Sequence, residues 1–166
     1  MKTLKTVTIA LFLCLGQITF AQESIENPTG AEDIKVVTDY IDALTNNKMD
    51  LAASLMADDH IGAGPSANET ETKAETMASW TENHKVRTNH KNDYVSNSFR
   101  VVGGDLEGDW VSVWGTYTFT QNSIDIELPY QYTGEVKDGK IKRSIIYYDK
   151  LAINIAMGYE LTAKKQ

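Results

Sequence analysis

The chain has 166 residues, a formal net charge of −7 at pH 7 and a single cysteine. An acidic balance argues against nucleic acid and anionic membranes as partners, because both carry negative charge themselves. The length suits one domain with a hydrophobic core, and a single cysteine excludes a disulfide within the chain.

Residues 1–21 have the pattern of a secretory signal peptide. Two lysines precede the apolar run VTIALFLCL, and small residues occupy the positions that determine a cut after Ala21. The run is too short to span a membrane, so we expect an exported protein, periplasmic or extracellular. Cleavage would remove the cysteine and two lysines, which takes the net charge from −7 to −9. The alternatives are a retained N-terminal anchor and lipidation of Cys14, which the bulky Phe12 and Leu13 disfavour.

Helical patterns dominate the first half of the mature chain. Residues 22–30 are polar, contain proline and glycine, and are expected to form a flexible leader. Apolar residues at helical spacing then predict a helix over 31–44 and a shorter one over 49–57. A loop at the rim of a pocket is expected at 58–65, and a third helix at 69–87.

Strand patterns fill the second half. Alternating segments rich in Val, Ile, Thr, Tyr and Trp, with short turns between them, predict antiparallel strands. These strands are expected at 92–102, 109–121, 124–136 and 140–148. A short helical segment follows at 151–159. The order predicts an α+β fold, with N-terminal helices packed on a curved antiparallel sheet of about four long strands, in a single domain over 31–160.

Three segments resemble one known family. Residues 40–65, YIDALTNNKMDLAASLMADDHIGAGP, resemble the helical entrance of the NTF2-like superfamily, which includes the SnoaL-like polyketide cyclases and the ketosteroid isomerases. Residues 135–150 are similar to the last hairpin of the SnoaL-like family, and residues 151–159 to its short closing segment. The resemblance runs through the mature chain in the right order, and it implies a cone that encloses a ligand pocket.

The resemblance also locates the chemistry of a ketosteroid isomerase. It places the isomerase tyrosine on Tyr40, the base on Gly64 and the neutral acid on Gln131. A glycine cannot abstract a proton, so steroid isomerisation is not expected. Gln131 still offers a hydrogen bond to a carbonyl oxygen, and whether the protein is an enzyme stays open.

Acid/base chemistry of the cyclase type would need a different group. Candidates are Asp59 and His60, with His84 and His90 further along, and His60 is the group expected to titrate near neutrality. A solvated helix end is the alternative for Asp58 and Asp59. Histidine spacing matches no zinc motif, so we expect no metal and no cofactor, with a site made by His60, His84 and an acid as the alternative.

Alternation divides each strand into two faces, and the resemblance implies which of the two points into the cone. We expect Trp114 and Thr116 to point inward and Val111, Val113, Tyr117 and Phe119 to point outward, where they would form a homodimer interface. Core packing is the alternative for each aromatic residue. The expected ligand-binding residues are Tyr40, Met56, His60, Trp80, His84, Trp114, Thr116, Gln131, Thr133, Ile146 and Tyr148.

Three functions are consistent with these patterns. The first is binding of a small, mostly apolar or aromatic molecule in the conical pocket. The second is an acid/base enzyme of the cyclase, isomerase or hydrolase type, in which His60 or Asp59 carries the proton while Tyr40 and Gln131 polarise the substrate. The third is a protein-interaction module that uses the apolar sheet face.

Overall fold

The computed structural model describes residues 26–162. The predicted signal peptide, its cleavage site and residues 22–25 of the leader lie outside this range. Within residues 26–162, no helix combines the length and the apolar character that crossing a membrane requires.

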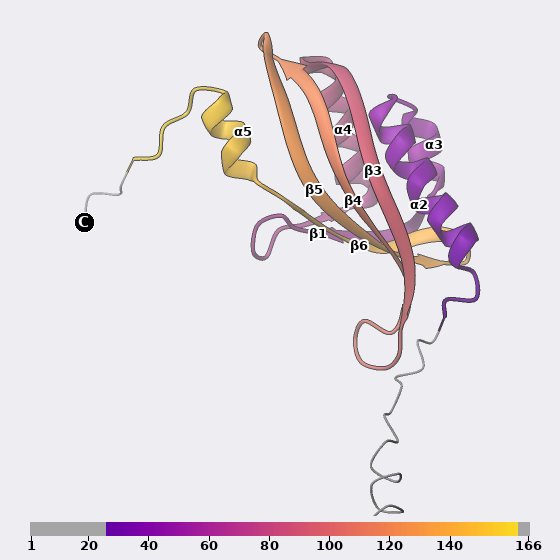
Figure 1. Cartoon of the computed structure of the whole chain (residues 1–166). Helices are drawn as coiled ribbons and strands as arrows, with labels where there is room; N and C mark the ends of the chain where they lie inside the picture. Colours follow the sequence, from indigo (N-terminus) through magenta and orange to yellow (C-terminus); the bar gives the residue numbers. More distant parts are fainter. Residues whose placement is uncertain (1–25, 163–166) are drawn as a thin grey trace, which may run out of the picture.

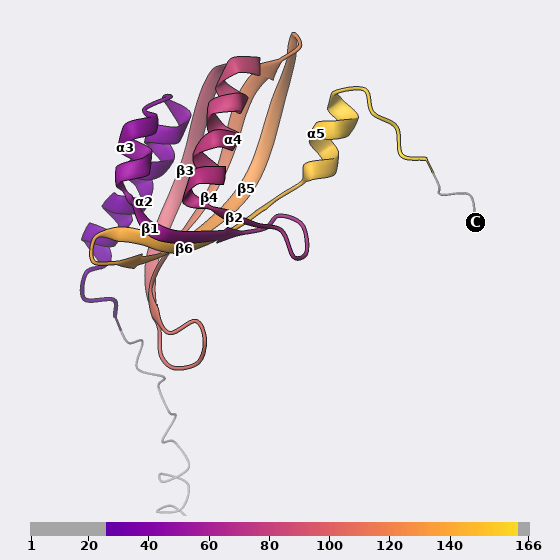
Figure 2. The ribbon, with the colours of Figure 1, turned by 180° about the vertical axis from the view of Figure 1, so that it is seen from behind.

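Three helices cover one face of a curved sheet (Figures 1 and 2). They are α2 (Gly30–Thr45), α3 (Met49–Ser54) and α4 (Lys73–Val86). Helix α2 buries Val37, Ile41 and Leu44 on one side, as its helical spacing predicts. The end of the predicted leader belongs to the domain, because Asn27 and Thr29 both hydrogen-bond the carboxylate of Asp33 in the first turn of α2.

Within the described residues the sheet has six strands in the order β2-β1-β6-β5-β4-β3. Four long strands pair as successive antiparallel hairpins, as predicted. The strands are β1 (Met56–Ala63), β2 (Thr70–Thr72), β3 (Arg87–Val101), β4 (Gly108–Gln121), β5 (Ile124–Lys137) and β6 (Lys140–Tyr148). The short helix α5 (Lys150–Ala156) follows β6 and stands apart from the other helices (Figure 1).

Two short strands replace the loop and part of the helix predicted before residue 73. Strand β1 occupies most of the predicted loop 58–65 and runs parallel to β6, so the sheet is mixed. Strand β2 occupies residues expected to be helical and pairs with β1. Helix α4 begins only at Lys73, because Thr72 and Glu75 form a capping box in which each side chain binds the other's backbone N–H.

The predicted orientation of β4 and β5 is wrong. Val111 and Val113 are fully buried in the core that the helices cover, and Tyr117 and Phe119 are buried on the same side. The opposite face of these strands therefore carries the residues expected to point inward: Trp114, Thr116, Gln131 and Thr133. Trp114 is 47 % exposed there.

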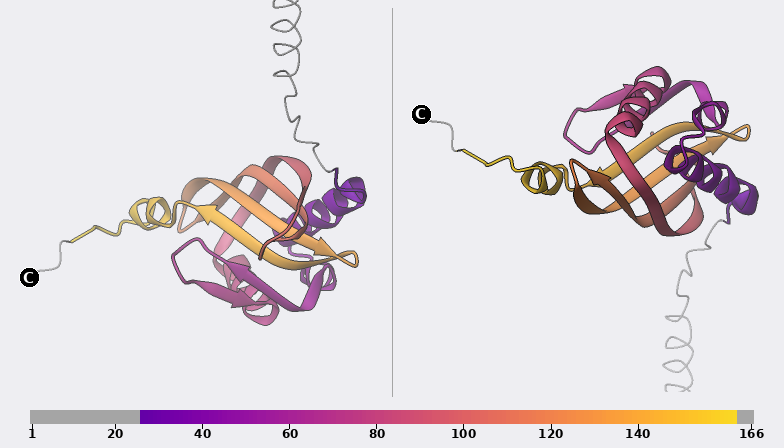
Figure 3. Two further views of the ribbon diagram at one scale, coloured as in Figure 1. Left: turned by 90° about the horizontal axis from the view of Figure 1, so that it is seen from below. Right: turned by 90° about the horizontal axis from the view of Figure 1, so that it is seen from above.

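The curved sheet wraps around the helices, which gives the molecule its conical form (Figure 3). The larger apolar cluster joins α2 to the first half of β4, the second half of β5 and the start of β6. A second cluster, of Tyr117, Phe119, Ile126 and Leu128, lies towards the end of β4 and the start of β5. The predicted α+β architecture is confirmed, with six strands in place of about four.

Candidate ligand pocket

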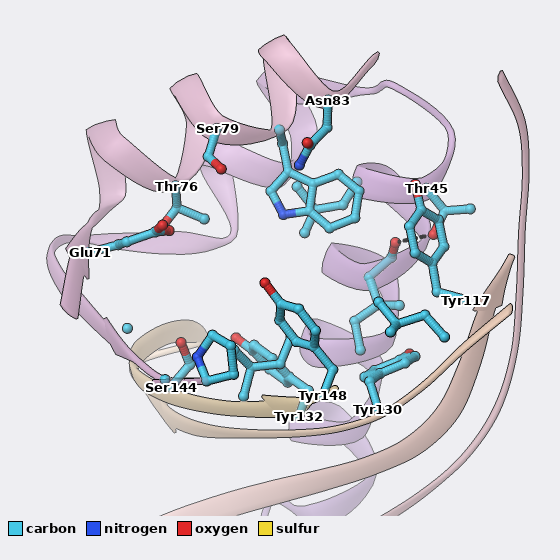
Figure 4. A pocket seen from close by; sticks show the side chains of 18 of the residues that line it. Thr45, Glu71, Thr76, Ser79, Asn83, Tyr117, Tyr130, Tyr132, Ser144 and Tyr148 are labelled. Atoms are coloured by element: carbon cyan, nitrogen blue, oxygen red, sulfur yellow. Dashed lines mark hydrogen bonds between the residues drawn. The ribbon is translucent and has the colours of Figure 1, made fainter. Parts of the chain in front are cut away.

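A cavity of about 270 Å³ lies between the helices and the inner face of the sheet. Thr76, Ser79 and Asn83 reach into it from α4, and tyrosines from β5 and β6 face them from the sheet (Figure 4). Six aromatic side chains line the cavity: Tyr40, Trp80, Tyr117, Tyr130, Tyr132 and Tyr148. These walls suit a small molecule with an apolar or aromatic body.

A glycine fixes the position of one tyrosine in the wall. Gly115 lies opposite Tyr130 in the β4–β5 ladder, and a Cβ on Gly115 would come within 2.7 Å of the Tyr130 ring. The ring can therefore lie against the strand backbone only because residue 115 has no side chain. This arrangement holds Tyr130 in the cavity wall.

Three buried polar atoms in the wall have no hydrogen-bond partner among the described residues. They are the hydroxyls of Tyr130 and Tyr132 and the side-chain oxygen of Asn92. Asn92 lies near Tyr130, and Ser144 near Tyr132, but neither contact has the geometry of a hydrogen bond. Leaving such groups unpaired costs about 1–3 kcal/mol each, so a ligand that pairs with them gains that energy.

Both phenols stay protonated at neutral pH. Burial raises the pKa of Tyr130 to about 12 and raises the pKa of Tyr132 further. Burial also raises the pKa of Tyr40, with contributions from Tyr132 and from the negative charge of Glu71. Each of these hydroxyls can therefore donate or accept a hydrogen bond but carries no charge.

Glu71 supplies a carboxylate at the cavity wall, from strand β2 (Figure 4). Its side chain accepts a hydrogen bond from the Thr76 hydroxyl at 3.3 Å. A second carboxylate, Glu69, also lines the cavity, but Lys150 binds both of its oxygens at 2.7 and 2.9 Å. Glu71 is therefore the acid of the wall that forms no ion pair with a described residue.

The position that the resemblance assigns to the isomerase base cannot hold a side chain. Gly64 lines the cavity with a φ of +93°, and a Cβ there would lie 2.2 Å from the backbone oxygen of Ile146. The base is thus excluded by the backbone arrangement of the hairpin. Glu71 lies on the strand that pairs with β1, opposite Gly62, and brings a carboxylate to the same cavity from the other side of the hairpin.

Asp59 and His60 lie outside the cavity wall. Asp59 is exposed and pairs with Lys142. His60 is buried behind the wall, where its Nε2 lies 3.0 Å from the hydroxyl of Ser144, a wall residue. Burial and, to a smaller extent, the charge of Lys73 lower the pKa of His60 to about 4, so the ring is neutral at pH 7.

The other two histidines also lie behind the wall. His84 Nε2 is 2.7 Å from the backbone oxygen of Leu44, and His90 Nδ1 is 2.6 Å from the Tyr117 hydroxyl. The His90 Nε2 must carry its proton, because it contacts the carbonyl oxygen of Arg87, and Nδ1 therefore accepts from Tyr117. No group of three or more potential metal ligands occurs among residues 26–162.

Solved structures with this architecture are numerous, whereas neither a protein-family model nor a curated protein matches the chain. One is a protein from Catenulispora acidiphila with a ketosteroid isomerase-like fold, solved in complex with trimethylamine. It superposes with a TM-score of 0.61 at 16% sequence identity, and the match covers 77% of this chain and 97% of that chain. A protein from Shewanella denitrificans that is assigned to the SnoaL-like polyketide cyclases superposes with a TM-score of 0.61 at 14% sequence identity. The match covers 81% of this chain and 100% of that chain. An LEH-like epoxide hydrolase of M. tuberculosis superposes with a TM-score of 0.61 at 16% sequence identity, and the match covers 79% of this chain and 88% of that chain.

The chain has the NTF2-like fold. Within this fold the structure places four of the expected ligand-binding residues on the cavity wall: Tyr40, Trp80, Ile146 and Tyr148. Met56, His60 and His84 lie behind the wall, and Met56 is fully buried in the core. Trp114, Thr116, Gln131 and Thr133 lie on the outer face of the sheet.

The sequence analysis missed several wall residues of this NTF2-like cavity. Tyr117, Tyr130 and Tyr132 belong to the strand faces that were assigned to the outside. Glu71 was assigned to a helix, although the pattern Thr72-x-x-Glu75 is a capping-box signal that would have placed the start of the helix after Glu71.

Proposed function

We propose that the protein binds a small, mostly apolar or aromatic molecule in the conical cavity. The observation that carries this proposal is the pair of buried, unpartnered hydroxyls on Tyr130 and Tyr132 in an aromatic wall. A structure that keeps such groups unpaired loses stability, which is understandable where a ligand pairs with them. The trimethylamine bound to the Catenulispora protein of similar fold also supports a small ligand.

Tyr132→Phe should bind 2-naphthol more weakly than the wild type, yet resist unfolding better. The hydroxyl has no partner in the free protein, so its removal should raise the free energy of unfolding by about 1 kcal/mol. The same change removes a hydrogen bond to the bound naphthol and should raise Kd several-fold. Fluorescence titration and urea denaturation measure the two effects.

Tyr94→Phe is the matched control. The Tyr94 hydroxyl donates to Asp42 at 3.0 Å, and Tyr94 is not part of the cavity wall. This variant should lose stability and bind 2-naphthol as the wild type does. A wild-type protein that shows no saturable binding of 2-naphthol, or a Tyr132→Phe variant that binds it equally well, would contradict the proposal.

Acid/base catalysis is a second candidate, and Glu71 is the observation that favours it. A carboxylate at 71 would abstract a proton from the substrate, while Tyr130 or Tyr132 would donate a hydrogen bond to the developing oxyanion. Asp59 and His60 are not used, since one is solvent-exposed and the other lies behind the wall. In this case Glu71→Gln would abolish turnover.

We also propose that residues 1–21 direct export of the protein.

We further propose a homodimer that forms through the outer sheet face. Val95, Trp114 and Tyr147 lie in one row across the strands, with Gln131 between the last two, and are 68, 47 and 57 % exposed. A row of large apolar side chains on an open face favours association.

Native mass spectrometry and sedimentation should therefore find a dimer of the wild type and a monomer of Trp114→Glu. The variant should still bind 2-naphthol, because Trp114 lies on the face opposite the cavity. A monomeric wild type would contradict the dimer and would leave the apolar row free for a different protein.

A further inference from the structure

The polar groups of the cavity wall include two that offer only acceptor atoms. The carboxylate of Glu71 and the side-chain oxygen of Asn92 can only accept hydrogen bonds, and the Asn92 oxygen is buried without a partner. The free hydroxyls of Tyr130 and Tyr132 can accept as well as donate. A ligand that supplies N–H or O–H donors satisfies more of this wall than one that supplies only carbonyl oxygens.

Two of the cations around the cavity pair with carboxylates, and a third, Arg87, has only neutral partners among the described residues. Lys150 binds Glu69, and Lys73 binds Asp58 and the backbone oxygen of Met56. Arg87 lines the cavity, but its Nε donates to Gln121 at 3.1 Å and its guanidinium lies 4.2 Å from the centre of the Phe119 ring. The one hydrogen bond that Glu71 receives from a described side chain comes from a neutral hydroxyl, that of Thr76.

The charge of Glu71 reaches the interior of the cavity. Glu71 adds to the effect of burial in raising the pKa of Tyr40 on α2, and it also acts on Tyr148 on β6, where Lys150, Glu69 and Arg87 have larger effects. A partly buried carboxylate that forms no ion pair is stabilised when an opposite charge comes near it. The missing opposite charge can come from a ligand.

The aromatic wall is compatible with a positive charge. The faces of Trp and Tyr rings attract cations, most strongly when the cation is desolvated. The tyrosines around Glu71 are neutral. They therefore do not repel a cation that approaches the carboxylate, and they do not neutralise the carboxylate themselves.

We propose that the ligand is a protonated amine with an apolar or aromatic body, and that its ammonium group binds Glu71. This inference rests on the proposed function, because it names the chemical class of the molecule in the same cavity. Glu71 is then the residue that selects a cation over a neutral molecule of equal shape.

Two probes of nearly equal shape test the selection. 2-Phenylethylamine is protonated at pH 7, and propylbenzene replaces the ammonium group by a methyl group. Calorimetric titration of the full chain should give a Kd for the amine at least about tenfold lower than for propylbenzene, which corresponds to about 1.4 kcal/mol. Glu71→Gln should weaken binding of the amine about tenfold and leave propylbenzene unchanged.

Glu82→Gln controls for net charge. Glu82 is an exposed residue of α4 that pairs with Lys85 and is not part of the cavity wall, so the variant loses the same charge far from the ligand. It should bind both probes as the wild type does. Glutamine at 71 keeps an oxygen that can accept from Thr76, so the local fold should persist, which circular dichroism checks.

The outcomes separate this inference from the proposed function. Propylbenzene bound as tightly as the amine, or an amine affinity that Glu71→Gln leaves unchanged, would overturn the cation proposal while small-molecule binding stands. Failure of both probes and of 2-naphthol to bind the wild type would overturn both.

Discussion

Gly64→Ala should lower the free energy of unfolding by roughly 3 kcal/mol or more, a loss at the upper end of single substitutions. The methyl group would lie 2.2 Å from the carbonyl oxygen of Ile146, which is backbone and cannot rotate away. The φ of +93° adds strain for any residue with a Cβ. Urea denaturation of the two proteins measures the difference.

Gly139→Ala separates the clash from the backbone strain. Gly139 also has a positive φ, +68°, but a Cβ there would meet nothing within 4 Å. Its replacement should cost only about 1 kcal/mol. Equal losses at the two positions would show that the approach of Ile146 contributes nothing.

This result would bear directly on the chemistry. If alanine is not tolerated at Gly64, an aspartate is not tolerated there either, because both begin with the same Cβ. The isomerase base could then not be restored by one substitution, and a carboxylate would have to enter the cavity from another strand, as Glu71 does.

Acidification from pH 6.5 to pH 4 should remove about 3 kcal/mol of stability through His60 alone. The pKa of His60 falls from 6.5 in the unfolded chain to about 4 in the fold, chiefly because of burial. The unfolded state therefore binds more protons than the folded state between these pH values. The contribution of the neutral His60 to the free energy of unfolding is complete above pH 6.5. It is lost as the pH falls towards 4, at about 1.4 kcal/mol per pH unit.

His60→Gln provides the comparison. Glutamine does not titrate, and its amide can still hydrogen-bond the Ser144 hydroxyl that His60 contacts. Carboxylates with a lowered pKa, such as Asp109 beside Arg100, make both proteins less stable in acid. Their contribution is the same in both and cancels when the two stability curves are subtracted. Parallel stability curves for the two proteins, from urea denaturation at several pH values, would be incompatible with a buried neutral imidazole.

The strands that alternation marks clearly were predicted nearly to the residue. Strand β6 was expected at 140–148 and spans Lys140–Tyr148, and β5 differs by one residue. Strand β1 was missed because its residues, MADDHIGA, combine two aspartates, a glycine and no regular alternation. It is held by pairing with β6 and β2, contacts that no local pattern in the chain announces.

The orientation of the strands could not be predicted because both faces of β4 carry large side chains. Trp110 and Trp114 have even numbers and lie on one face, whereas Tyr117 and Phe119 have odd numbers and lie on the other. Alternation therefore defines two faces but does not tell which of them the helices cover. The outer face also buries Trp110, which is 3 % exposed, its indole N–H bound to the backbone oxygen of Leu106 and its ring close to Arg143.

The parallel pairing of β1 with β6 has a consequence for how the cavity is assembled. His60 and Ser144, which touch behind the wall, are 84 positions apart, whereas β3, β4, β5 and β6 join through local hairpins. Contacts between distant parts of a chain form slowly, because a long loop must close first. Strand β1 and its partner β2, which carries Glu71, have no edge to join until β6 is in place. Glu71 and the tyrosines of β5 and β6 therefore come together only once β6 has formed, and no N-terminal portion that ends before β6 contains the binding site.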